Sequence, residues 1–309
     1  MPPTIMEITE WLKAGHDLPL EIHGMIDSDS VYPTADPDIL EVWIHDFTGS
    51  LPLEFERWWL ERTDCLLDQV LTIPLPRPDG PWTGSRLDIH PAFSSGFELP
   101  GVRYLSSTNA PEPDAIRRLV GIRDRLATPA FRDLVDRVLG PAGYGHDLVT
   151  APGSHRSHHS EPGGLLRHTV EVAEAVERAT GDLSTNALER DAAVVAALLH
   201  DVGKLVLAGS EQDLVPVLST EHDRLIEYAA ADSLCMLREE NRDAYDALWH
   251  VIKGFEHGDH YHCPVAALIR ACDAMSARTD LVWKARKKHR SRGNWVRFKG
   301  HPPIFVPAG

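Results

Sequence analysis

The chain has 309 residues, 43% of them hydrophobic, and a formal net charge of −15 at pH 7. This length and composition allow two compact domains, and the acidic balance argues against unspecific binding of nucleic acid over the whole surface. No apolar run approaches the length of a membrane span and no segment resembles a signal, so we expect no membrane partner.

A β-hairpin is predicted near the amino terminus. Apolar and polar side chains alternate over residues 40–44, residues 46–49 are typical of a turn, and the alternation resumes over residues 51–55. Residues 73–101 are rich in Pro and Gly, which is typical of irregular strands and long loops. We therefore expect a β-rich domain in residues 1–110.

A helical domain is predicted to follow. Residues 109–114 are typical of a linker, and two helices are expected after it, at 116–126 and 129–139. The second of these begins with a proline, and Thr128 before it is a suitable cap. These helices would form the first layer of a helical domain over residues 111–281.

An almost wholly apolar helix is predicted at residues 191–199, and it leads directly into His200 and Asp201. Burying an imidazole and a carboxylate without partners is costly. A divalent cation would satisfy both groups and keep the carboxylate ionised. We expect Gly203 to end this helix in a left-handed cap.

Two further helices are predicted to direct polar side chains into the same interior. His168 lies in the helix predicted at 163–180, on a face with apolar neighbours at helical spacing. Asp273 lies in the helix predicted at 264–278, four residues after Ile269 in its apolar stripe. The His168 side chain is therefore expected to point inward, and that of Asp273 to point inward or to lie at the seam between helices.

Helical bundles often build metal sites from side chains on facing helices. Imidazole and carboxylate ligands suit Mn²⁺, Mg²⁺, Fe²⁺, Zn²⁺ or Ni²⁺ rather than a metal that prefers soft ligands. The sequence therefore predicts one or two divalent ions, held by His168, His200, Asp201 and Asp273.

The order of these four residues, with a Gly-Lys pair shortly after Asp201, resembles the HD-domain superfamily of metal-dependent phosphohydrolases. The preceding His158-His159 and the Pro-Gly-Gly-Leu-Leu-Arg-His-Thr run at 162–169 resemble HD-type 3′-to-5′ exoribonucleases and the HD-containing, relaxase-type TraI proteins of conjugative elements. The resemblance covers residues 114–281. It implies an α+β fold, in which an all-α HD bundle follows a small β-rich and OB-like domain.

The resemblance also implies further ligands. Dinuclear members of the superfamily have additional histidines between the His-Asp pair and the last aspartate, where this chain has His222, His250 and His257. These three residues are therefore expected to bind a second ion or to contact the substrate directly.

The residues predict hydrolysis by a metal-bound water, because a divalent ion lowers the pKa of that water toward neutrality. Asp201 would bridge two ions, and Lys204 would neutralise phosphate charge in the transition state. His158 and His159 precede the helix of His168. They are candidates for proton transfer or for stacking on a base, and the alternative is a solvated turn.

The carboxy-terminal residues 281–309 contain eight basic side chains and no acidic one, interleaved with aromatic residues. Such a tail can contact a phosphate backbone and stack on unpaired bases. Alternatively, its cations offset the acidic body in a packed tail. Nucleic acid is expected at the tail, residues 282–309, and at basic residues that lie along it: Lys284, Arg286, Lys287, Lys288, Arg290 and Arg292.

The sequence thus predicts a metal-dependent phosphodiesterase and, by resemblance, a 3′-to-5′ exonuclease of single-stranded RNA or DNA. The alternatives are a TraI-like protein that processes or binds DNA in conjugation, an enzyme that hydrolyses nucleotides or cyclic nucleotides, and a helical module that keeps metal for stability. Nothing in the sequence indicates the oligomeric state. Four cysteines without paired spacing indicate a reducing compartment, so we expect a cytoplasmic protein.

Overall fold

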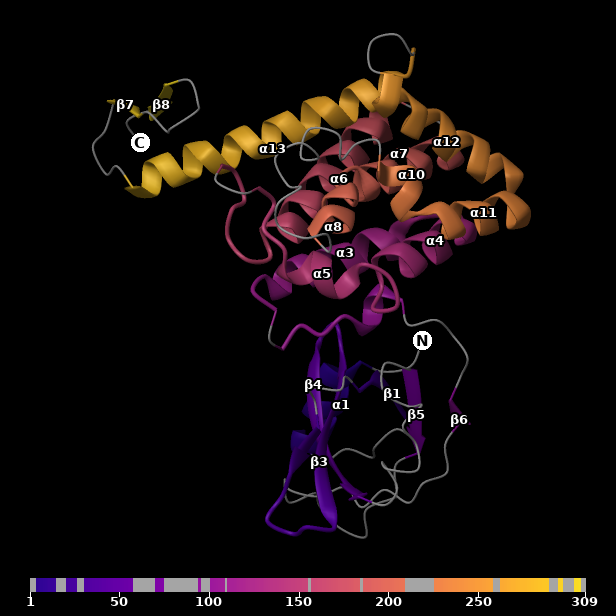
Figure 1. Cartoon of the computed structure of the whole chain (residues 1–309), viewed down its shortest axis with the longest axis vertical. Coiled ribbons are helices and arrows are strands. Elements are labelled where there is room, and N and C mark those ends of the chain that lie inside the picture. The colour runs from indigo at the N-terminus through magenta and orange to yellow at the C-terminus, as the bar shows by residue number, and fades with distance from the viewer. Residues whose placement is uncertain are drawn as a thin grey trace. The chain divides into compact units, whose positions relative to one another are not determined.

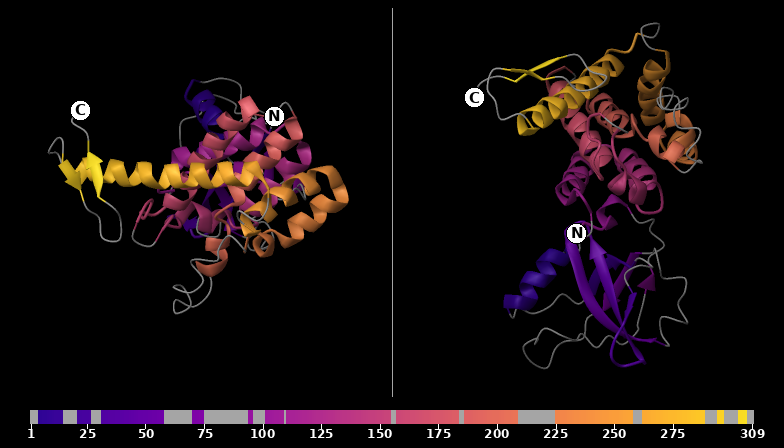
Figure 2. Two further views of the ribbon diagram at one scale, coloured as in Figure 1. Left: turned by 90° about the horizontal axis from the view of Figure 1, so that it is seen from above. Right: turned by 60° about the vertical axis from the view of Figure 1, so that its left-hand side comes forward.

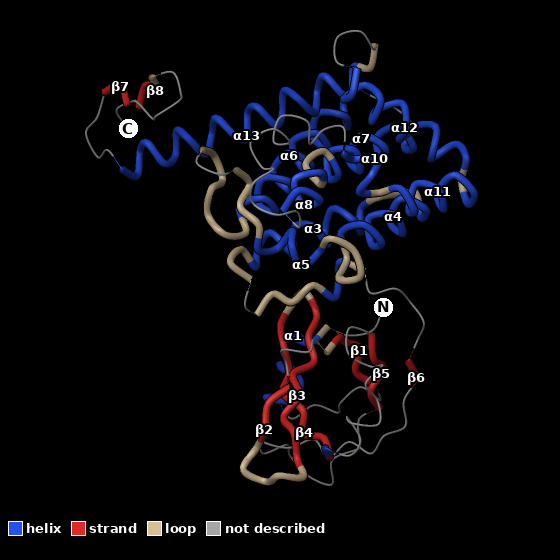
Figure 3. The backbone as a smooth tube through the Cα atoms, viewed as in Figure 1, coloured by secondary structure: helices blue, strands red, loops and turns tan. Residues whose placement is uncertain are grey.

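The computed structural model describes residues 4–14, 21–26, 31–57, 70–74, 94–95, 101–108, 110–154, 157–183, 186–208, 225–257, 262–288, 294–296 and 303–306. The chain forms two compact units (Figure 1), with the following ranges: Met1–Arg125 and Arg132–Asp147 in the first, Leu126–Phe131 and Leu148–Gly309 in the second. Helices, strands and loops are distinguished in Figure 3.

The first unit contains a six-stranded sheet in which every described pairing is antiparallel. Its strands are β1 (Glu21–Met25), β2 (Val31–Pro33), β3 (Ile39–Asp46), β4 (Gly49–Glu56), β5 (Val70–Pro74) and β6 (Ser94–Ser95). Strand β3 pairs with β2, β1 and β4, and β5 pairs with β1 and β6. A small amino-terminal antiparallel sheet is thus confirmed, whereas its OB-like character stays a prediction.

The predicted hairpin is confirmed by β3 and β4, whose register runs from Ile39 opposite Glu56 to Asp46 opposite Gly49. The described apolar side chains that alternate along the two strands, at positions 40, 42, 44, 51 and 53, are buried, as the period of two requires. Helix α1 (Ile5–Ala14) packs on β4 and buries Ile5 and Ile8. The buried Asp46 carboxylate accepts a hydrogen bond from the Ile5 backbone N–H at 2.9 Å, which ties the helix to the hairpin.

Four short elements follow the sheet: η3 (Val102–Tyr104), α3 (Pro113–Arg125), α4 (Pro129–Leu139) and α5 (Gly145–Thr150). The two helices predicted after the linker are confirmed as α3 and α4. Helix α3 and most of α4 group with the sheet in the first unit. The predicted domain limits at residues 110 and 281 differ from this grouping and stay a prediction.

The second unit is a helical bundle. Its helices are α6 (Gly164–Leu183), α7 (Ala187–Leu199), α8 (Gly203–Ala208), α10 (Ile226–Ala229), α11 (Ala231–Glu240), α12 (Arg242–His257) and α13 (Pro264–Lys288). Helix α6 packs against α7 and α13, and α12 packs against α7, α11 and α13. The three helices predicted to meet at one centre, α6, α7 and α13, are therefore neighbours in the bundle.

Helix α13 has 25 residues and continues ten residues beyond its predicted end. In Figure 2 it extends past the other helices of its unit. Strands β7 (Asn294–Val296) and β8 (Ile304–Val306) form an antiparallel pair, and β8 contacts α13. In the described part of the chain, no helix combines the length and the apolar character needed to span a membrane.

Candidate metal centre

Helix α6 positions the first ligand. The helix begins at Gly164, and its first turn buries Leu165 and Leu166, so that His168 one turn later is directed into the bundle and is fully buried. The predicted inward direction of His168 is thus what the structure shows.

The end of α7 positions the next two ligands. Asn186 caps the helix by accepting a hydrogen bond from the Leu188 N–H, and every residue of 191–199 is buried. The His200 Nδ1–H donates to the Ala197 carbonyl at 2.7 Å, which leaves Nε2 free to bind a metal. Burial lowers the pKa of His200, so its imidazole is neutral, as metal ligation requires.

The prediction that Gly203 ends this helix in a left-handed cap is wrong. His200 itself closes α7 in right-handed geometry, and Gly203 begins α8. The chain passes from one helix to the next through consecutive turns, with the Val202 N–H bonded to the Leu199 carbonyl at 3.0 Å and the Lys204 N–H to that of Asp201 at 3.0 Å. No reversal of the backbone is needed there, so glycine is not required for a positive φ.

Helix α13 supplies Asp273. Burial raises the pKa of this carboxyl, but the neighbouring imidazoles of His168 and His200 outweigh it, and the pKa of Asp273 lies below its ordinary value. The Asp273 side chain is 42% exposed, whereas those of His168, His200 and Asp201 are at most 5% exposed. The centre is thus buried around His168, His200 and Asp201, and solvent reaches it beside Asp273.

The four predicted ligands lie around His168 Nε2, and three of them, His168, His200 and Asp273, form a group that could hold a metal ion. His168 Nε2 lies 3.1 Å from Asp273 Oδ1, 3.4 Å from Asp201 Oδ2 and 3.4 Å from His200 Nε2. His200 Nε2 is 3.4 Å from the same Asp201 oxygen. Ligands bound about 2.1 Å from an ion are separated by about 3.0 Å in an octahedron and about 3.4 Å in a tetrahedron. The separations and the donor types therefore fit a first-row divalent ion or Mg²⁺.

Lys204 lies next to this centre. Its ammonium group donates to Asp201 Oδ2 at 2.6 Å and to the Gly153 carbonyl at 3.0 Å, and its side chain is 26% exposed. The positive charge is thus fixed beside the ligands and remains partly accessible to solvent. This is the placement that the predicted neutralisation of phosphate charge needs.

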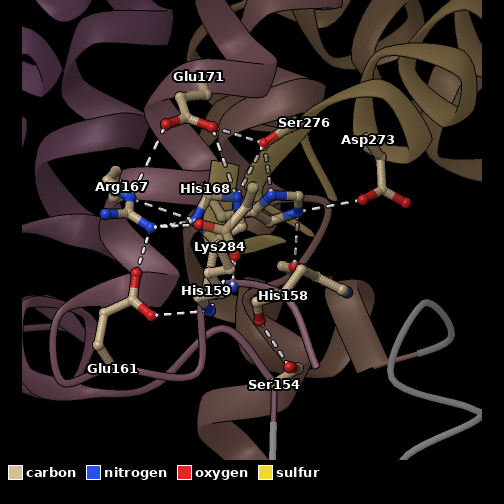
Figure 4. A network of polar contacts seen from close by, with 12 residues as sticks. Ser154, His158, His159, Glu161, Arg167, His168, Glu171, Asp273, Ser276 and Lys284 are labelled. Carbon is tan, nitrogen blue, oxygen red and sulfur yellow. Dashed lines mark hydrogen bonds and ion pairs between the residues drawn. The ribbon is translucent and has the colours of Figure 1, made fainter. Parts of the chain in front are cut away.

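The two histidines before α6 have different surroundings. The His158 ring centroid lies 5.5 Å from that of His168, and its buried Nδ1 finds no hydrogen-bond partner among the described residues. Burial, followed by the charges of His168 and Lys204, lowers the pKa of His158. The buried His159 uses both ring nitrogens, with Nε2 3.1 Å from Ser276 Oγ and Nδ1 3.0 Å from Arg167 Nη2 (Figure 4). His158 therefore has a nitrogen available for proton transfer, whereas His159 is held in a network.

The expected ligands of a second ion are not gathered in the described structure. His250 lies on α12 with an exposed side chain. His257 ends that helix, and its side chain lies outside the description, as does the whole of His222. The second ion stays a prediction.

The predicted nucleic-acid residues are divided between two environments. Lys284 lies in the bundle, with its ammonium group 2.8 Å from Asp280 Oδ2 and 3.0 Å from Glu161 Oε2. Arg286 and Lys287 are exposed on α13, and the Lys287 ammonium group lies 4.9 Å from the centre of the Trp283 ring. The remaining predicted positions lie outside the described side chains: Lys288, Arg290 and Arg292.

Sequence reasoning missed three polar residues around the ligands: Arg167, Glu171 and Ser276. Arg167 and Glu171 flank His168 on α6, and Ser276 follows Asp273 on α13 by three residues. The helical spacing of three to the predicted ligands was a usable signal for Glu171 and Ser276, because residues three apart share a helix face.

Comparison with known proteins agrees with this geometry. Residues 165–278 match the family model of the HD domain, and this range contains all four converging ligands. No curated protein and no solved structure matches the chain. The comparisons therefore establish the domain and leave its finer resemblance to exoribonucleases or TraI proteins without support.

Proposed function

Because residues 165–278 form an HD domain of the metal-dependent phosphohydrolase superfamily, we propose that this protein is a phosphodiesterase that shortens single-stranded nucleic acid from its 3′ end. The observation that carries hydrolysis is the convergence of His168, His200, Asp201 and Asp273 beside the ammonium group of Lys204. When bound, a divalent ion supplies a Lewis acid and lowers the pKa of a coordinated water.

Access to the centre supports catalysis rather than a purely structural metal. Structural sites are closed by protein ligands, whereas catalytic sites keep a position open to water or substrate. The described ligand group consists of His168, His200 and Asp273, with Asp201 adjoining it. Since the Asp273 side chain is 42% exposed, a phosphate group can approach from this side.

Lys204 and His158 support the reaction without binding the ion. The Lys204 ammonium group is held by Asp201 and the Gly153 carbonyl, so it is oriented before substrate arrives. A neutral His158 beside the ligands can pass a proton between water and a leaving oxygen.

Replacing Lys204 by methionine is expected to lower kcat for a phosphodiester by about 10²–10³-fold, the usual effect of removing one oriented charge from a transition state. Metal content should stay at the wild-type level, since the carboxylate of Asp201 loses a competing cation. Steady-state kinetics with a chromogenic phosphodiester, together with metal analysis of the same samples, checks both statements. Loss of the metal along with the activity would contradict this role.

The outer part of α13 supports a polymeric substrate. Trp283 on α13 and Trp295 on β7 are 52% and 68% exposed, and Arg286 and Lys287 lie on the same helix as Trp283. Exposed aromatic rings stack on unpaired bases, and cations beside them bind the backbone. Among the six predicted nucleic-acid residues, Arg286 and Lys287 are the described ones that remain exposed.

The proposal is tested with Mn²⁺ and single-stranded RNA and DNA labelled at either end, using Asp201→Asn as the inactive control. We expect a ladder that shortens from the 3′ end and is missing in the control. Hydrolysis of free or cyclic nucleotides without polymer cleavage would replace the proposal by a nucleotide phosphohydrolase. Binding of DNA without any cleavage would favour the TraI-like alternative.

The role of α13 is tested by reversing the charges of Arg286 and Lys287 to glutamate. We expect weaker and less salt-dependent binding of oligonucleotides, with unchanged hydrolysis of a small phosphodiester. The matched control is Arg178→Glu, which changes a 71% exposed residue on α6. Equal losses in both variants would show that overall charge, rather than this surface, governs binding.

A further inference from the structure

The hydroxyl group of Ser276 contacts three side chains in a polar network (Figure 4). It donates to Glu171 Oε2 at 2.7 Å, and it lies 3.1 Å from both His168 Nδ1 and His159 Nε2. Ser276 is 7% exposed. One side chain of α13 thus joins two groups of α6 to the loop that precedes it.

The donors and acceptors in this network can be assigned by counting protons. A serine hydroxyl has one proton and two lone pairs, and an ionised carboxylate can only accept. The proton of Ser276 therefore goes to Glu171, and both lone pairs accept from imidazoles. His168 must then carry its proton on Nδ1, and His159 must carry its proton on Nε2.

The other side of the His159 ring agrees with this assignment independently. Its Nδ1 lies 3.2 Å from Arg167 Nε and 3.0 Å from Arg167 Nη2. A guanidinium group can only donate, so this nitrogen must be an acceptor. Burial lowers the pKa of His159 to about 4, and the charges of His168 and Arg167 add to this against the opposing effect of Asp280. His159 is therefore a neutral ring with one defined tautomer.

The backbone of His159 is held as firmly as its ring. Its φ is 47°, in the left-handed region, which costs a residue other than glycine about 1–2 kcal/mol. Its N–H donates to Asp280 Oδ2 at 2.8 Å, and its carbonyl accepts from the Gly153 N–H at 2.7 Å. Such a conformation persists where the surroundings determine it strongly, as at functional sites.

We propose that Ser276 and Glu171 are positioning residues, which hold His168 as the Nδ1–H tautomer so that the lone pair of Nε2 faces Asp201 and Asp273. The inference rests on the metal centre of the proposed function. In His200 the backbone carbonyl of Ala197 has the same effect. For His168 the acceptor is the Ser276 hydroxyl, which is oriented by Glu171. His159 contacts the same hydroxyl and is in turn held by Arg167. Outer groups of this kind fix ligand orientation and basicity.

The test uses Ser276→Ala, with Ser276→Thr to restore the hydroxyl and Thr279→Ala as the control on the exposed face of α13. We expect Ser276→Ala to bind Zn²⁺ and Mn²⁺ about 10–100-fold more weakly by calorimetry. Ser276→Thr should recover most of the affinity, and Thr279→Ala should match the wild type. Wild-type affinity in a folded Ser276→Ala protein would overturn the proposal.

A second readout examines the tautomers directly. Long-range ¹H–¹⁵N spectra of the Zn²⁺-loaded wild type are recorded at about pH 8, because Zn²⁺ is diamagnetic and would take the place of a proton on His168 Nε2, which faces Asp201 and Asp273. We expect Nδ1–H at His168 and Nε2–H at His159. The opposite tautomer at His168 would overturn the proposal even if Ser276→Ala failed to fold.

Glu171→Gln provides a further variant, because its amide can donate to Ser276 and release the serine proton toward His168. We expect this variant to weaken metal binding, whereas Glu174→Gln on the same helix should not. These readouts are independent of hydrolysis. If the tautomers and affinities follow expectation but no phosphodiester is cleaved, the positioning role stands and the proposed function fails.

Discussion

Replacing Asp201 by asparagine is expected to empty the metal centre and to lower phosphodiester hydrolysis by at least about 10³-fold, since an ion contributes several kcal/mol of charge stabilisation. The reason is that one carboxylate oxygen of Asp201 lies close to both histidine ligands and to Lys204. Asp201 Oδ2 lies 3.4 Å from each ligating nitrogen of His168 and His200, and it accepts from Lys204 at 2.6 Å. A neutral amide removes the negative charge that holds both the ion and the ammonium group.

Metal content per chain and kcat are measured on the same preparation, after removal of metal with a chelator and reloading. The control is Asp246→Asn, at an exposed carboxylate that pairs with Arg242 on the surface of α12. It should keep both the metal and the activity. An Asp201→Asn protein that remains metal-loaded and active would show that the centre lies elsewhere.

Replacing Gly164 by alanine is expected to destabilise the helical unit by about 3 kcal/mol, at the upper end of the usual cost of overpacking. A Cβ atom at this position would lie 2.1 Å from the carbonyl oxygen of His159 and 2.7 Å from its carbonyl carbon. These are backbone atoms, and the same oxygen already accepts from the Gly153 N–H at 2.7 Å. The loop of His159 must therefore move, and Tm should fall by roughly 5–10 °C.

A matched control for Gly164→Ala is available in the same helix, α6. Gly181 lies on the same helix, and a Cβ there meets no atom within 4 Å. Since alanine favours a helix over glycine by up to about 1 kcal/mol, Gly181→Ala should be neutral or slightly stabilising. Thermal unfolding of both variants gives the comparison, and equal Tm values would contradict the close approach at Gly164.

The grouping of the candidate metal ligands could be predicted from the sequence because each is a polar residue in or next to an apolar helical segment. Such a residue needs a partner, and four that come from three neighbouring helices can share one. The HD-domain match and the grouping of His168, His200 and Asp273 are compatible with this reasoning, and metal binding by these residues stays a prediction. The β3–β4 hairpin was predictable for a similar reason, since its alternation has a period of two on both strands.

The positioning network could not be predicted in the same way. Ser276 and Glu171 are 105 residues apart, and a serine or a glutamate on a helix usually faces solvent. Their role depends on which helices are neighbours, which the local pattern does not contain. The length of α13 was missed because its apolar stripe stops while Lys and Arg, which are good helix formers, continue the helix.

The continuous helix α13 carries the candidate ligand Asp273, the neighbouring Ser276 and, farther along, the exposed Lys287. At 1.5 Å per residue, the backbone positions of Asp273 and Lys287 are about 21 Å apart. A stacked strand rises about 3.4 Å per nucleotide, so one that reaches both places needs about six nucleotides. If nucleic acid binds along this helix, shorter strands lose the outer contact and dissociate. The length of one helix would then set the size of the final products.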